Sequence, residues 1–121
     1  MIDVTDRYEL HPGEAFMNVN GFFTIAPNSE PYRYIIVPRE RGLVAEVTKP
    51  GVNNNFATGM ICYTDENNKV YGTDAITPRG DDTTVVPAQY NRFELKFPEK
   101  ATRVYVTSWV EMPPKIFKKV M

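Results

Sequence analysis

The chain has 121 residues, of which 42% are hydrophobic and 24% charged, and its formal net charge is −1. These values are typical of a single globular domain that is long enough to bury a core, so a disordered chain is excluded. They give no electrostatic reason to expect nucleic acid, which requires clustered Lys and Arg. No apolar run approaches the roughly 20 residues that span a bilayer, so we expect no membrane insertion.

The N-terminal segment MIDVTDRYEL carries two Asp, one Arg and one Glu. It lacks the basic start and apolar run of a secretory signal peptide. Cys62 is the single cysteine, so an internal disulfide is excluded. We therefore expect synthesis in the cytoplasm without a signal peptide, and folding that does not depend on oxidation.

Alternation of apolar and polar residues with period two predicts β-strands along most of the chain. The clearest example is RFELKF, in which Phe93, Leu95 and Phe97 alternate with charged residues. In chain order, the predicted strands are EAFMNV (14–19), FFTIA (22–26), YRYIIV (32–37), LVAEVT (43–48), ATGMICYT (57–64), a short strand around 85–86, RFELKF (92–97) and TRVYVTS (102–108).

Turn residues separate these runs, as at His11-Pro12-Gly13 and Pro98-Glu99-Lys100. About eight short strands joined by such turns predict an all-β fold, an antiparallel β-sandwich of jelly-roll type over residues 1–112. Alternation places Phe93, Leu95 and Phe97 in its core, together with Val104 and Val106 of the last predicted strand.

The C-terminal segment MPPKIFKKVM is the one candidate helix. Ile116, Phe117, Val120 and Met121 would share one face of a short helix that begins with proline in its first turn. Because such a segment is too short to fold alone, we expect residues 113–121 to form a tail outside the sandwich. The hypothesis is that its apolar face docks on a neighbouring chain.

The sequence TDENNK collects Asp65, Glu66, Asn67 and Asn68, and it raises the question of a calcium site. A calcium loop needs oxygen ligands at alternate positions and a central glycine, whereas here the acids are adjacent and Lys69 follows them. Asp and Asn also favour hairpin turns through local hydrogen bonds. We interpret the segment as a turn between two strands, and we predict no bound metal and no cofactor.

The sequence contains few features that are typical of an enzyme active site. His11 is the only histidine, and neither Ser29 nor Ser108 lies in a nucleophile-elbow sequence. Cys62 lies within an apolar strand and is interpreted as a buried hydrophobic residue. The glycines are isolated, so no phosphate-binding loop is predicted. A carboxylate pair for glycoside hydrolysis stays open, because such pairs meet only in space. On balance the sequence predicts a protein that is not an enzyme.

Aromatic residues supply the candidate ligand-binding site. Tyr105 and Trp109 lie on the opposite face of their strand from Val104 and Val106, so they face outward if the valines form the core. Exposed aromatic rings suit stacking on a sugar or a protein partner. Polar loops add further candidates, namely Asn53, Asn54, Asn55 and Arg79. The alternative is that the rings pack against a second sheet and the asparagines form a solvated loop.

Three segments carry a resemblance to a known group of proteins: YRYIIVPRERGLVAEVTKP, ICYTDENNKVYGTDA and VVPAQYNRFELKFPEKATRVYVTS. Their order is similar to that of the β-sandwich modules, like carbohydrate-binding modules, of bacteriophage tail and head-fibre proteins. The matching features are Ile35–Val37 before Gly42, the hairpin from Tyr63 to Val70, and the Val86-Pro87 entry to a strand. Here Thr64 interrupts the family's Tyr-Asp pair, and the hairpin lacks a glycine.

The resemblance implies a virion protein, such as a decoration, fibre or tail-associated subunit, that is oligomeric and assembles with other virion proteins. The alternative that it implies is a glycan-binding or host-surface adhesion module that uses exposed aromatic residues. It transfers no binding residue to this chain.

Overall fold

The structure is a computed structural model, and it describes residues 1–17, 22–48, 60–74 and 90–120. Just over half of these residues lie in strands, and the only helical segment among them is the 3₁₀ turn η1 (Thr5–Arg7). The strands are β1 (Ile2–Asp3), β2 (His11–Pro12), β3 (Glu14–Met17), β4 (Phe23–Ala26), β5 (Tyr32–Pro38), β6 (Leu43–Val47), β7 (Ile61–Thr64), β8 (Val70–Asp74), β9 (Asn91–Glu94), β10 (Arg103–Trp109) and β11 (Lys115–Lys118). The all-β prediction is confirmed; the strand predicted around residues 85–86 lies outside the described residues.

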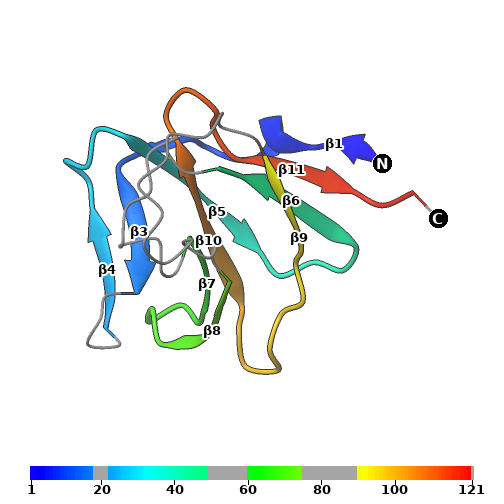
Figure 1. Ribbon diagram of the computed structural model, residues 1–121. Coiled ribbons are helices and arrows are strands. Elements are labelled where there is room, and N and C mark those ends of the chain that lie inside the picture. Colours follow the sequence, from blue (N-terminus) through cyan, green and yellow to red (C-terminus); the bar gives the residue numbers. More distant parts are fainter. Residues whose placement is uncertain (18–21, 49–59, 75–89, 121) are drawn as a thin grey trace, which may run out of the picture.

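All the paired strands are antiparallel, and they form three sheets (Figure 1). A four-stranded sheet has the order β1-β11-β6-β9, and a five-stranded sheet has the order β2-β5-β10-β7-β8. The hairpin β3-β4 forms a separate two-stranded sheet. Because β10 pairs along its whole length with β5 and along half of it with β7, it is the central strand of the larger sheet.

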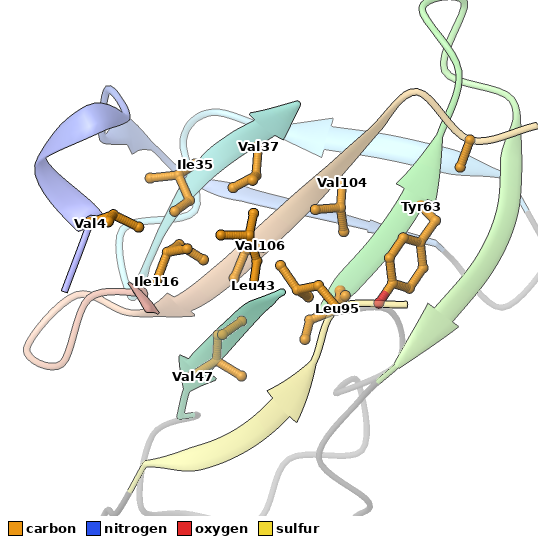
Figure 2. Close-up of a cluster of buried hydrophobic side chains, with 13 residues drawn as sticks. Val4, Ile35, Val37, Leu43, Val47, Tyr63, Leu95, Val104, Val106 and Ile116 are labelled. Carbon is orange, nitrogen blue, oxygen red and sulfur yellow. The ribbon is translucent and has the colours of Figure 1, made fainter. Parts of the chain in front are cut away.

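Both larger sheets contribute side chains to one hydrophobic core, where residues of β5, β6, β10 and β11 converge (Figure 2). Val104 and Val106 are fully buried there, and Leu95 is 5% exposed, as the alternation predicted. Phe93 and Phe97 are partly buried and pack against the same cluster. The period-two pattern therefore identified the inward face of both segments correctly.

A second, smaller cluster lies on the opposite face of the five-stranded sheet. It joins Ala15 of β3 to Tyr34, Cys62 and Tyr105 of the sheet. The side chain of Phe23 on β4 packs against it, with its ring centroid 4.7 Å from that of Tyr105. The β3-β4 hairpin thus covers the face that the sequence alone left open.

The helix predicted near the C-terminus is wrong, and so is the boundary at residue 113. Lys115–Lys118 form strand β11, which pairs with β6 on one side and β1 on the other. Ile116 is fully buried in the main core, and its N–H donates to the Thr5 hydroxyl at 2.9 Å. Pro113 and Pro114 end the turn after β10, and the short segment that follows gains far more from completing a sheet than from a single helical turn.

Candidate functional site

The Asp65–Lys69 segment forms the turn between β7 and β8, as predicted. The Asp65 carboxylate accepts hydrogen bonds from the backbone N–H of Asn67 at 2.9 Å and of Lys69 at 3.0 Å. Its second oxygen accepts from the Tyr71 hydroxyl at 3.0 Å. These bonds, led by that from Lys69, hold the pKa of Asp65 below its usual value. Both oxygens of the carboxylate therefore accept hydrogen bonds that stabilise the turn.

Asn68 links this turn to the central strand β10. It adopts a left-handed backbone conformation with φ of 64°, which Asn tolerates better than most residues. Its side-chain oxygen accepts from the Arg103 guanidinium at 2.7 Å and from the Tyr105 hydroxyl at 2.9 Å. The polar residues of the TDENNK turn thus make bonds within the chain.

Tyr105 is not the exposed ring that the outward-facing hypothesis required. It is 2% exposed, lies beneath Phe23, and is close to Tyr34, with ring centroids 6.0 Å apart. The alternative interpretation, in which the ring packs against a second sheet, is correct. Trp109 is half-buried at the end of β10. The other ligand-binding candidates, Asn53, Asn54, Asn55 and Arg79, lie outside the described residues.

The residues proposed for docking on a partner differ in their burial and do not form one exposed face. Ile116 belongs to the core, whereas Phe117 is half-buried on the other face of β11. Val120 is 65% exposed. Met121 lies outside the described residues. Of the four, Val120 is the described residue that is open to a partner.

A groove of about 550 Å³ runs between β8 and β9. These are edge strands of the five-stranded and four-stranded sheets, respectively, within the described residues. The groove is lined by Gly72–Asp74, Arg92–Glu94 and Lys96, with Tyr63 and Pro98 beside Gly72. Sequence reasoning missed this site, because its residues come from separate segments and follow no motif.

The lining of the groove is balanced in charge. Asp74 and Glu94 oppose Arg92 and Lys96, and Arg92 pairs with Glu46 at 2.8 Å. Burial raises the pKa of Asp74 above its usual value. Within the same lining, burial raises the pKa of Tyr63 to about 12, and its oxygen accepts from the Lys96 backbone at 3.0 Å. The described lining of the groove therefore offers donors, acceptors and aromatic residues, and its positive and negative side chains are equal in number.

The described residues show no arrangement for nucleophilic catalysis around His11 or Cys62. The His11 ring stacks on Tyr34, with centroids 5.0 Å apart, and its Nε2 lies 3.9 Å from the Glu9 carboxylate. Cys62 is fully buried, and this burial raises the pKa of its thiol to about 12. Such a thiol is a weak nucleophile at neutral pH.

The described part of the chain holds neither a cluster of metal ligands nor a helix that could span a membrane. No three His, Cys, Asp or Glu side chains gather closely enough there to hold a metal ion. No helix in the same residues has the length and apolar character needed to cross a membrane. Comparison with known proteins found no matching family model, and no curated protein or solved structure with significant similarity.

Proposed function

We propose that the chain is a non-enzymatic β-sandwich module of jelly-roll type that assembles with other subunits of a bacteriophage particle. The shared core of the two larger sheets is consistent with a sandwich. The segments that resemble phage fibre modules supply β5, β6, β7, β8, β9 and β10. The resemblance therefore concerns the strands that build both sheets.

The observation that carries an assembly role is the apolar surface beside β1. Among the described residues, this strand is an edge of the four-stranded sheet, and Ile2 within it is 57% exposed. Met1 and Val120 are 54% and 65% exposed, and Figure 1 shows the N-terminus and β11 on this side of the molecule. An open strand edge with exposed apolar side chains is suited to contact another protein.

The test uses cells that produce the phage particle. The tagged full-length chain should sediment with particles in a density gradient. Ile2→Lys combined with Val120→Lys should keep the chain out of the particle fraction, while its melting temperature changes little because both side chains are exposed. The matched control is Phe22→Lys, a change to a 69% exposed residue beside β4 on the other side of the molecule.

The control should still enter particles. A wild-type chain that remains with the soluble proteins would rule out a virion role. Incorporation of the double variant at the wild-type level would instead show that the β1 surface is not the contact.

The β8-β9 groove favours a second candidate function, the binding of a neutral glycan. Sugar hydroxyl groups both donate and accept hydrogen bonds, and the lining of the groove includes the Asp74 carboxylate as an acceptor and the Arg92 guanidinium as a donor. Phe93, which lines the groove and is only partly buried against the core, is the candidate apolar contact for a sugar ring. The balanced charge gives no preference for a strongly ionic ligand.

An array of printed oligosaccharides tests this candidate. The purified chain should bind a neutral glycan, and Asp74→Ala should weaken that binding by roughly tenfold or more, because a partly buried hydrogen-bond acceptor is lost. Glu99→Ala, which removes an exposed acid outside the groove, is the control and should bind normally. Binding that is insensitive to Asp74→Ala, or no binding at all, would reject the groove as a glycan site.

A further inference from the structure

The β3-β4 hairpin is structurally separate from the two larger sheets. Its strands pair with each other from Glu14↔Ala26 to Met17↔Phe23, and among the described residues they join no other ladder. The hairpin lies against the outer face of the five-stranded sheet, at one side of the molecule (Figure 1). The hairpin is therefore attached to the five-stranded sheet by contacts of side chains and by the chain segments at its ends.

One buried hydroxyl group makes two of the polar contacts that attach the hairpin. Thr107 Oγ1 accepts from the Ala15 N–H at 3.1 Å and donates to the Ala15 carbonyl at 2.9 Å. Thr107 is fully buried on β10. The remaining contacts come from the small cluster, in which β3 and β4 cover Tyr34, Cys62 and Tyr105, and the Cys62 sulfur interacts with the Met17 backbone.

The two ends of the hairpin meet at one narrow point. Gly13, which precedes β3, has φ of 99°, and a Cβ there would lie 2.2 Å from the Ala26 carbonyl oxygen at the end of β4. The Gly13 N–H donates to the Tyr32 carbonyl at 3.0 Å, which ties this point to the start of β5. The hairpin is thus connected to the rest of the fold at one end and rests on the sheet along its length.

The main core lies on the other face of the five-stranded sheet and includes none of the described residues of the hairpin. Lifting the hairpin would therefore break the Thr107 bonds and the small cluster but would leave the core between the larger sheets intact. Regions with few buried contacts open at a lower free energy than the whole fold.

We propose that the β3-β4 hairpin opens as a unit around Gly13, without unfolding of the larger sheets, and uncovers the aromatic face formed by Tyr34 and Tyr105. Cys62 lies in this face and is the only cysteine of the chain. It is fully buried when the hairpin is closed. This opening is a property of the isolated chain and does not depend on assembly into a particle.

The rate at which a disulfide reagent such as 5,5′-dithiobis(2-nitrobenzoate) modifies Cys62 measures the opening. In the native full-length chain, modification should proceed at a rate that hardly changes with low concentrations of urea, because opening exposes little surface. Thr107→Val should accelerate modification by roughly tenfold or more, since it removes both bonds to Ala15.

Two variants control for general loosening of the sheet. Thr107→Ser keeps the hydroxyl group and should retain a rate near that of the wild type. Thr64→Val makes the same Thr-to-Val change at a fully buried residue of β7 whose hydroxyl bonds to none of the described residues, and it should not accelerate modification.

The hydrogen exchange of backbone amides supplies a second readout if Thr107→Val folds poorly. In the wild-type chain, the amide of Ala15 should exchange faster than that of Val106 in the centre of β10. Modification of Cys62 with the full urea dependence of global unfolding, or equal protection of these two amides, would show that the hairpin opens only when the whole fold does.

Discussion

At the scale of single residues, two buried threonines on neighbouring strands differ in what their hydroxyl groups contact. Thr107 bonds to both backbone groups of Ala15, whereas the hydroxyl of Thr64 has no hydrogen-bond partner within the described part of the chain. Thr107→Val should lower the free energy of unfolding by about 1–3 kcal/mol, because the Ala15 N–H loses its acceptor. Thr64→Val should raise it by about 1 kcal/mol, because no bond is lost and an unsatisfied polar group is removed. Urea denaturation measures both, and equal destabilisation would contradict this account.

A half-buried carboxyl group makes stability depend on pH. Burial raises the pKa of Glu14 above its usual value of 4.5, so the folded state disfavours the ionised form. Below the pKa that Glu14 has in the unfolded chain, the carboxyl group is protonated in both states and does not affect stability. The free energy of unfolding then falls as the pH rises through the pKa of Glu14 in the folded chain. Glu14→Gln should therefore stabilise the chain at pH 7, with the gain disappearing towards pH 4. Urea titrations at the two pH values measure this, and the exposed Glu99→Gln should show no such difference.

Alternation identified the inward residues Val104, Val106 and Leu95, because the period of a strand determines which side chains share a face. It could not show that Tyr105 is buried. That depends on the β3-β4 hairpin, whose position follows from contacts between residues about 80–90 positions apart, such as Phe23 with Tyr105. A periodic pattern assigns a residue to a face but does not say what covers that face.

At the scale of elements, variants of β11 test whether the C-terminal segment is part of the fold. Ile116→Ala should cost about 2–5 kcal/mol of stability, because Ile116 is fully buried in the main core. Truncation after Pro113 should unfold the domain, since it leaves β6 without one neighbour and opens the core. Val120→Ala, a change to a 65% exposed residue, should shift the stability by less than about 0.5 kcal/mol. Thermal denaturation measures the stability of each variant. A truncated chain with the melting temperature of the full chain would instead support the prediction that residues 113–121 form a tail outside the sandwich.

The same element shows why a short segment is ambiguous in sequence. Four residues, Lys115–Lys118, are compatible with one helical turn or with a short strand. Local propensity differs little between these alternatives, and neither is stable alone. The open edge of β6 decides the outcome, because it offers backbone partners for Lys115–Lys118 and a core site for Ile116.

At the scale of the whole molecule, the two larger sheets should unfold together. They share the main core, and backbone links join them, since Thr48 beyond β6 accepts from the Trp109 N–H at 3.0 Å and donates to the Ser108 hydroxyl at 2.8 Å. Fluorescence of Trp109, the single tryptophan, reports on β10, whereas far-ultraviolet circular dichroism reports on all strands. The two urea transitions should coincide. An earlier loss of circular dichroism that is larger than the β3-β4 hairpin alone accounts for would indicate that the four-stranded sheet unfolds separately.

The sequence by itself determined the all-β class, the inward residues of the long strands and the turn at Asp65–Lys69. These features depend on side-chain periodicity and on local turn chemistry, which act within a few residues. The tertiary structure alone decided that Tyr105 is covered, that residues 115–118 complete a sheet, and that Asp74 and Arg92 face one groove. Each of these outcomes requires a partner from a distant part of the chain, and it is the burial of surface between such partners that selects among locally similar alternatives.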